Sequence, residues 1–191
     1  KIYHFGPLLS GDIAMNVYIA LKQLPGIKII DVQGLVRQVR KDNVVWQSNK
    51  DVRKILSNFD IIKCDQAELN YITNSTNHNK SIDQLMRCGI EEIIVTNGSH
   101  GSVIYSKSEG ELNIPSFKPN RFKDTTGCGD TFTAIYAYSR LRDYPIYEAG
   151  LFASAGASLK IEHVGPLSAS IERIKEKIEK HYKKRSLQLI A

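Results

Sequence analysis

Residues 124–130, with the sequence DTTGCGD, bring two glycines and two aspartates together in one short segment. The hydrophobic run TFTAIYAYSRL follows directly and predicts a helix that starts there. Glycine lets a backbone approach a ligand closely, and a helix N-terminus presents unpaired N–H groups with a partial positive charge. Phosphate is a common occupant of such a site. The N–H groups of Gly127, Cys128 and Gly129 are therefore candidates for an anion hole.

Asp130 ends this glycine loop and has two interpretations. A carboxylate beside a phosphate site repels the ligand unless it takes part in the chemistry. If its carboxylate accepts the proton of an attacking hydroxyl group, Asp130 acts as a general base. The alternative is that Asp130 only caps its helix. The short motif by itself favours neither interpretation.

The elements around the loop alternate between strand and helix. We expect strands at 1–5, 27–32, 60–64 and 91–96, and a hairpin of 101–106 with 110–116. We expect helices at 10–24, 51–59, 66–73, 82–88, 130–142, 146–160 and 172–185, with Ser10, Asp65 and Ser81 as N-caps and a polar loop at 73–81. Helices between strands imply βαβ units and a mostly parallel sheet. The segments DVQG, KCDQAE and TNGSHG fall at strand ends or at loop-to-helix junctions, where an open parallel sheet binds ligands.

Other nucleotide-binding motifs are missing from the chain: there is no GxxxxGK[ST], no GxGxxG after a strand and no protein-kinase set. DTTGCGD instead resembles the DTxGAGD signature of the ribokinase (PfkB-type) carbohydrate kinases. KCDQAEL, VTNGSHGSVIY and FASAGASLKIEHVGP resemble three further segments of that family, in the same order. DVQGLVR and IEHVGP are similar to its inositol-kinase branch. The resemblance implies a three-layer α/β/α ribokinase-like fold with a mostly parallel central sheet.

The resemblance also implies roles for single residues. Asp130 matches the catalytic base, and Gly127, Cys128 and Gly129 match the anion hole. Glu68 matches the acid that organises Mg²⁺ through water beside the triphosphate. The residues that match nucleotide contacts are Asp65, Glu68, Thr96, Gly98, Gly101, Ser154 and Ala157. The residues that match a site for K⁺ or a similar cation, mostly through backbone carbonyls, are Asp124, Thr126, Lys160, His163 and Gly165.

Two residues depart from the family pattern. Cys128 replaces an alanine, which leaves the backbone N–H unchanged. Its thiol either fills an alanine-sized space or has its pKa lowered by the helix N-terminus. Asp65 replaces an asparagine and adds negative charge beside the phosphates, so it serves either as a nucleotide contact or only as an N-cap. Arg37 is open to two interpretations as well: a phosphate or substrate contact, or a surface salt bridge.

The family's usual N-terminal third, with its lid and most of its sugar contacts, has no counterpart here. We expect residues 1–191 to form a single, partial ribokinase-like α/β domain. The chain does not start with Met, which indicates that it is processed or begins inside a longer protein. Its first residues do not resemble a signal peptide.

The composition is that of an ordinary globular protein, with 42% hydrophobic and 24% charged residues. Three widely spaced cysteines argue against a disulfide framework or a zinc site, and no apolar run is long enough to span a bilayer. The net charge of +6 is concentrated in ERIKEKIEKHYKKR at 172–185. An amphipathic helix with Ile171, Ile174 and Ile178 turned inward explains this run better than nucleic-acid binding does.

The family resemblance implies a kinase that transfers the γ-phosphoryl group of ATP to a sugar, polyol or nucleoside, and the few scattered cysteines lead us to expect it in the cytoplasm. The expected cofactors are ATP and Mg²⁺, with K⁺ left open. The expected partner is a small-molecule acceptor, with no nucleic acid and no membrane, and a homodimer is left open. The alternative function is a nucleotide-binding or regulatory member of the family without catalysis.

Overall fold

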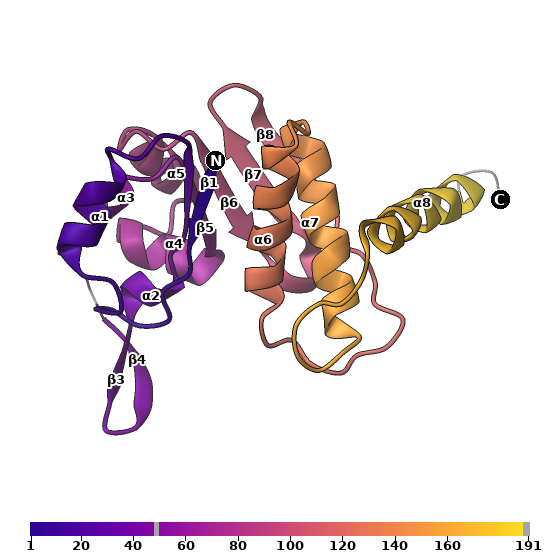
Figure 1. Cartoon of the computed structure of the whole chain (residues 1–191), viewed down its shortest axis with the longest axis horizontal. Coiled ribbons are helices and arrows are strands. Elements are labelled where there is room, and N and C mark those ends of the chain that lie inside the picture. The colour runs from indigo at the N-terminus through magenta and orange to yellow at the C-terminus, as the bar shows by residue number, and fades with distance from the viewer. Residues whose placement is uncertain (48–49, 189–191) are drawn as a thin grey trace. The chain divides into compact units, whose positions relative to one another are not determined.

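The computed structural model describes residues 1–47 and 50–188, with the backbone alone for 184–188 (Figure 1). The strands are β1 (Ile2–Phe5), β2 (Ile27–Asp31), β3 (Arg37–Arg40), β4 (Asn43–Trp46), β5 (Ile61–Asp65), β6 (Glu92–Thr96), β7 (Ser102–Ser106) and β8 (Gly110–Ile114). The helices are α1 (Met15–Leu21), α2 (Gln33–Val36), α3 (Val52–Leu56), α4 (Gln66–Thr73), α5 (His78–Met86), the 3₁₀ turn η1 (Gly98–His100), α6 (Cys128–Leu141), α7 (Ile146–Ile161) and α8 (Ile171–Gln188). The chain divides into two compact units. Unit 1 holds residues 1–97 and 103–112, and unit 2 holds 98–102 and the chain from 113 onward.

A six-stranded sheet in the order β1-β2-β5-β6-β7-β8 organises unit 1. Its pairs β1–β2, β2–β5 and β5–β6 are parallel, with Ile29 opposite Ile61 and Ile62 opposite Ile93. The predicted mostly parallel sheet is thereby confirmed. Residues 107–109 join β7 to β8, and a connection of this length makes a hairpin and not a crossover.

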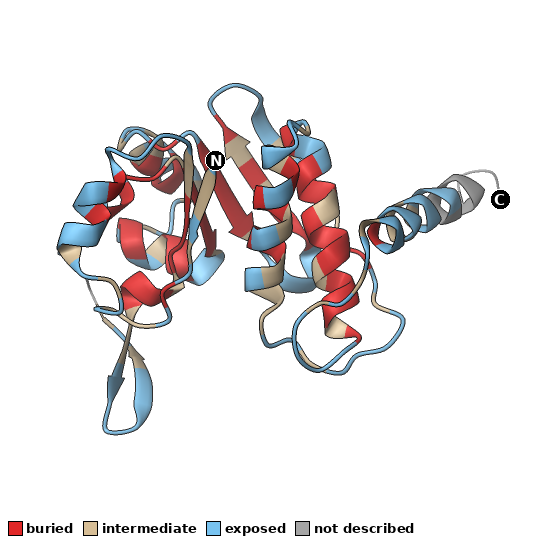
Figure 2. Cartoon of the chain, viewed as in Figure 1, coloured by how far each residue is buried: buried red, intermediate tan, exposed pale blue. Residues whose placement is uncertain are grey.

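The apolar core of unit 1 takes alternate residues of the central strands, such as Ile62 and Ile93, and therefore packs on one face of this sheet. β5 and β6 are buried along four consecutive residues each, as expected for parallel strands that are covered on both sides (Figure 2). One apolar cluster runs from Tyr18 on α1 through Leu56 and Leu69 to Val95. This burial holds rigid the strand ends that carry the candidate residues of unit 1.

In unit 2, α6 and α7 lie side by side (Figure 1). Gly156 of α7 faces α6, and a Cβ there would stand 2.1 Å from Ile135 Cδ1. The missing side chain lets the two helices approach closely. Ile174 of α8 is buried, while Ile171 and Ile178 are half-buried, so the predicted amphipathic helix is confirmed. The side chains of residues 184 and 185, the end of the predicted basic run, lie outside the described residues.

The predicted helix at 10–24 is present only as the shorter α1, and its Ser10 cap is wrong. α1 begins at Met15, and no side chain caps it. The Asp12 carboxylate instead accepts the backbone N–H groups of Leu8 and Leu9, both at 2.9 Å. These hydrogen bonds hold residues 8–12 in a turn, so the helix begins only after this segment.

The predicted Ser81 cap is wrong for a related reason. α5 begins at His78, four residues before the predicted start at 82, and Asn77 caps it by accepting the Lys80 N–H at 3.0 Å. Ser81 is buried inside the helix, where its hydroxyl lies 2.8 Å from the Thr73 hydroxyl of α4. The polar loop therefore spans only 74–77.

The hairpin β3–β4 was not predicted. Lys41 and Asp42 connect its strands with φ values of 47° and 63°. Two positive φ values indicate a type I′ turn, which usually carries asparagine and glycine and is therefore hard to recognise in Lys-Asp. None of the helices in the described part of the chain is both long and apolar enough to cross a membrane.

Candidate active site

The glycine loop forms the N-terminus of α6 in unit 2. Gly127 is the N-cap with φ 76°, a left-handed conformation that glycine adopts without strain. The Cys128 N–H donates to the Thr125 carbonyl at 3.1 Å, so it is already engaged. Over residues 1–47 and 50–188 the N–H groups of Gly127 and Gly129 have no acceptor. Of the three predicted anion-hole donors, these two are free to bind an anion.

Asp130 is the third residue of α6 and is exposed. It is not the N-cap, because Gly127 holds that position and no side-chain hydrogen bond caps the helix. A Cβ built on Gly127 would lie 3.9 Å from Asp130 Oδ2, so the carboxylate stands directly over the glycine loop. The described residues offer it no hydrogen bond or ion pair. The capping interpretation is therefore wrong, and the carboxylate is available to a ligand at the loop.

Asp124, at the start of the loop, is held from two sides. The Thr126 N–H donates to Asp124 Oδ1 at 2.9 Å, and the Lys160 ammonium donates to Oδ2 at 3.0 Å. These hydrogen bonds, the one from Thr126 first, lower the pKa of Asp124 to about 2. Lys160 Nζ also donates to the carbonyls of Asp124 at 3.2 Å and His163 at 3.4 Å. Gly165 follows with φ 84° in the turn after α7.

Two hydrogen bonds join the segments of unit 2 that carry the predicted nucleotide residues Gly101 and Ser154. Gly101 closes the η1 turn with φ 95°, and a Cβ there would lie 2.3 Å from the Ile114 carbonyl oxygen. The Ser116 hydroxyl donates to the Ser99 carbonyl at 2.6 Å. The Ser154 hydroxyl of α7 donates to the Pro115 carbonyl, also at 2.6 Å. The η1 turn, the segment after β8 and α7 are therefore tied together.

Cys128 connects α7 to the glycine loop. Its Sγ lies 3.9 Å from the Ala157 carbonyl oxygen. Burial raises the pKa of the Cys128 thiol above its ordinary value, against the effect of Lys160. The thiol is therefore protonated near neutral pH, which favours a space-filling role over a reactive one.

Asp65 and Glu68 form the N-terminus of α4 in unit 1. Asp65 Oδ1 accepts the Glu68 N–H at 2.8 Å, and Glu68 Oε2 accepts the Asp65 N–H at 2.9 Å. This reciprocal capping box confirms the predicted Asp65 cap. Arg37 Nη2 lies 3.3 Å from Glu68 Oε1, whose side chain is only 3% exposed. Burial raises the pKa of Glu68, so that part of its acidity is lost.

Lys63 forms a buried ion pair in unit 1 that sequence reasoning missed. Its Nζ lies 2.7 Å from Asp31 Oδ2, and both side chains are at least nine-tenths buried. Burial opposes the charge on Lys63, but the adjacent Asp31 outweighs it and raises the lysine pKa. The available signal was a lysine inside the apolar strand DIIKC. Thr96, one strand further along, donates to the Cys64 carbonyl at 3.3 Å.

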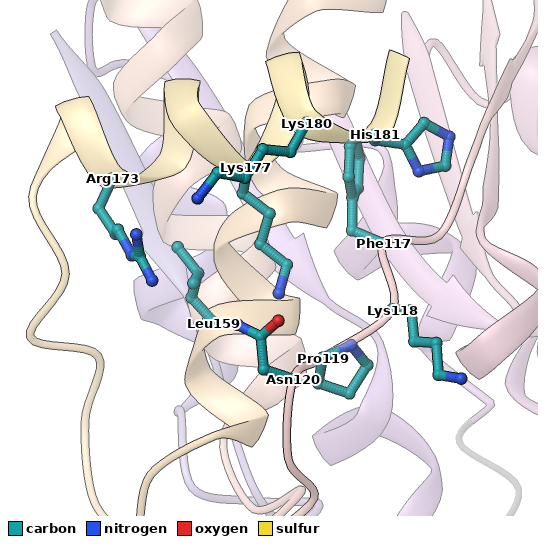
Figure 3. Close-up of a pocket in the computed structure, with 9 residues that line it drawn as sticks. All are labelled: Phe117, Lys118, Pro119, Asn120, Leu159, Arg173, Lys177, Lys180 and His181. Atoms are coloured by element: carbon teal, nitrogen blue, oxygen red, sulfur yellow. The ribbon is translucent and has the colours of Figure 1, made fainter. Parts of the chain in front are cut away.

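Unit 2 also contains a pocket with a volume of about 430 Å³ (Figure 3). Its lining residues come from α7, α8 and the segment after β8: Phe117, Lys118, Pro119, Asn120, Leu159, Arg173, Lys177, Lys180 and His181. Lys177 pairs with Glu162 at 2.8 Å, and the Phe117 and His181 rings lie 4.8 Å apart. The lining includes neither Asp130 nor the glycine loop, so this pocket is not the predicted phosphate site.

Comparison with known proteins shows that most of the chain matches one family. Residues 27–173 match the pfkB family of carbohydrate kinases. A nucleoside kinase of Methanocaldococcus jannaschii is 34% identical over 94 residues, which are 48% of this chain and 31% of that protein. A ribokinase of Arabidopsis thaliana is 26% identical over 125 residues, which are 63% of this chain and 33% of that protein. The matched stretch is thus about a third of the length of each of these relatives.

The similar solved structures include a pyrophosphate-dependent kinase of the ribokinase family, in complex with a pyrophosphate analog and myo-inositol. It superposes with a TM-score of 0.79 and is 25% identical. The match covers 92% of this chain and 62% of that one. The predicted ribokinase-like fold is confirmed by this likeness.

Proposed function

Because the chain belongs to the pfkB family of carbohydrate kinases, we propose that it transfers the γ-phosphoryl group of ATP to a hydroxyl group of a sugar, polyol or nucleoside. The observation that carries this proposal is the Asp130 carboxylate. It is exposed at the first turn of α6, beside two N–H groups that have no acceptor in the described part of the chain. A base and an anion hole at one helix terminus suit the attack of an alcohol on a phosphoryl group.

In this mechanism Asp130 accepts the proton of the acceptor hydroxyl while its oxygen attacks phosphorus. The N–H groups of Gly127 and Gly129 donate to the oxygens of the transferring phosphoryl group. Charge is spread over those oxygens in the transition state, so donors that are fixed in place before the reaction stabilise it. The hydrogen bonds of Asp124 to Thr126 and Lys160 hold the loop that carries them.

Glu68 is the residue proposed to organise Mg²⁺. Residues 1–47 and 50–188 contain no group of three His, Cys, Asp or Glu side chains that could bind a metal directly. Mg²⁺ commonly keeps several waters and binds through one or two carboxylates plus substrate phosphates. Both Glu68 oxygens already accept one hydrogen bond each, and the second lone pair of each remains for water. When bound, the ion neutralises charge on the phosphates.

The phosphoryl donor and the acceptor define the experiment. The natural polypeptide that carries this sequence is incubated with Mg²⁺ and either ATP or pyrophosphate, because one similar structure is of a pyrophosphate-dependent kinase. Myo-inositol, ribose and inosine serve as acceptors, and ³¹P NMR detects a new phosphate monoester. We expect a monoester with ATP and at least one of these acceptors.

A second measurement separates this function from a nucleotide-binding member without catalysis. Isothermal titration calorimetry of ATP with Mg²⁺ is performed on the same protein. Binding without any monoester, across an acceptor panel widened to other sugars, polyols and nucleosides, would favour the non-catalytic alternative. Monoester formed from pyrophosphate alone would keep the transferase and refute ATP as the donor.

A further inference from the structure

Lys160, near the end of α7, has a buried ammonium group surrounded by oxygen atoms. Its side chain is 2% exposed, which is rare for lysine unless the charge is compensated. Nζ donates to Asp124 Oδ2 at 3.0 Å, to the Asp124 carbonyl at 3.2 Å and to the His163 carbonyl at 3.4 Å. An ammonium group has three protons, and here three acceptors receive them.

These acceptors belong to the segments that the family resemblance assigns to a monovalent cation. That site would use the oxygens of Asp124 and Thr126 together with carbonyls after α7. The carboxylate and the carbonyl of Asp124 and the carbonyl of His163 already face Lys160 Nζ. A K⁺ ion bound to the same oxygens would lie against a second positive charge in a buried place, where repulsion is poorly screened. The residues present therefore do not fit a K⁺ ion at this position.

We propose that the Lys160 ammonium replaces the monovalent cation and makes this chain independent of K⁺. Lys160 thereby becomes a positioning residue for the glycine loop. It binds both the carbonyl and the carboxylate of Asp124, while the N–H groups of Lys123 and Asp124 donate to the Ile161 carbonyl at 3.0 and 3.2 Å. The hydrogen bonds of the Lys160 ammonium thus hold the backbone before Gly127 against the end of α7, where a free ion would otherwise be needed.

The thermal unfolding of the protein in different salts tests this proposal without any need for turnover. The wild type and the variants Lys160→Ala and Lys160→Met are melted at one ionic strength in KCl, NH₄Cl, NaCl and tetramethylammonium chloride. We expect the wild type to melt within about 1 °C in all four salts, since the Lys160 ammonium already occupies the cation position. Removing one partner of a buried pair should lower the melting temperature of both variants by roughly 5 °C or more.

The two variants differ in whether they leave room for an ion. Lys160→Ala opens a space lined by the three oxygens, so K⁺ or NH₄⁺ should raise its melting temperature in a saturable way that tetramethylammonium cannot reproduce. Lys160→Met fills much of that space, so we expect little or no rescue. Lys177→Ala is the matched control, because Lys177 is another mostly buried lysine of unit 2, paired with Glu162. It should be destabilised without any preference for a particular cation.

Two results would overturn the proposal. One is a saturable rise of the wild-type melting temperature that K⁺ produces and tetramethylammonium does not. The other is a Lys160→Ala variant as stable as the wild type in tetramethylammonium. The wild-type series remains decisive even if Lys160→Ala fails to fold. Because no step depends on phosphoryl transfer, failure here leaves the proposed kinase function untouched, and the reverse also holds.

Discussion

Replacement of Asp130 by asparagine separates a chemical role of this carboxylate from a structural one. Asparagine has nearly the same shape but cannot accept the proton of an attacking hydroxyl. The loss of a general base typically lowers a rate by a factor on the order of 100 to 10,000. We therefore expect Asp130→Asn to lose turnover by this factor.

The effect on stability should be small, because Asp130 is exposed and makes no contact with described residues that the change would break. What is lost is the attraction between a negative charge and the N-terminus of α6, which contributes about 0.3–1 kcal/mol. Affinity for ATP should hold or rise, since a negative charge near the phosphates is removed. A large rate loss with a small stability loss is the expected signature of a catalytic base.

Glu148 provides a matched control within the same unit. It is the third residue of α7, as Asp130 is of α6, and it is also exposed. Glu148→Gln removes an equivalent charge from an equivalent helix position but lies on another helix terminus, outside the glycine loop. It should show the same small loss of stability with turnover unchanged.

The assay combines monoester formation, ATP calorimetry and thermal unfolding for the wild type and both variants. Near-normal turnover of Asp130→Asn would refute the role as a base. A rate loss accompanied by a drop in melting temperature much larger than that of Glu148→Gln would also refute it, because the loss would then follow from a damaged helix. An equal rate loss in Glu148→Gln would show that charge alone, at either helix terminus, controls the rate.

Three further substitutions test the loop and its supports. Cys128→Ala should retain turnover, because the anion hole uses backbone N–H groups, and should change stability by no more than about 1 kcal/mol; a kinetic assay that finds turnover abolished in a folded variant contradicts this. Gly101→Ala should destabilise the protein by roughly 1–3 kcal/mol in denaturant titration, and by more than Gly89→Ala, which has a similar positive φ but no atom within 4 Å of the added Cβ. Asp124→Asn should be less stable than the wild type above about pH 4, because the pKa of Asp124 is about 2 in the folded protein and 3.8 ordinarily. The difference in stability should shrink as the pH falls toward 2. A difference in melting temperature that stays constant from pH 2 to 7 would contradict that pKa.

Local sequence signals were sufficient where the structure depends on nearby residues. The buried strands β2, β5 and β6 could be predicted because parallel strands with two covered faces are apolar throughout. The Asp65 cap of α4 could be predicted from the sequence, and Glu68, three residues later, completes the capping box. The glycine loop could be located because only glycine adopts the conformation of Gly127 without strain.

Other local predictions failed because a different polar side chain fixed the backbone near the expected helix start. Ser10 and Asn77 are both suitable N-caps, but only Asn77 became one. Asp12 accepts the N–H groups of Leu8 and Leu9 and so fixes a turn around Ser10, and Ser81 lies inside α5. Which polar side chain becomes the N-cap depends on the backbone turn that the fold requires at that point.

The sequence by itself determined the mostly parallel α/β fold, the family and the position of Asp130 after two glycines. These properties follow from periodicity, from glycine conformation and from motifs that are contiguous along the chain. The tertiary structure decided that Asp130 does not cap its helix and that the Cys128 N–H is already engaged. It alone brought the Lys160 ammonium to Asp124, 36 residues away along the chain. A side chain's direction depends on the packing around it, and no spacing within the sequence encodes that packing.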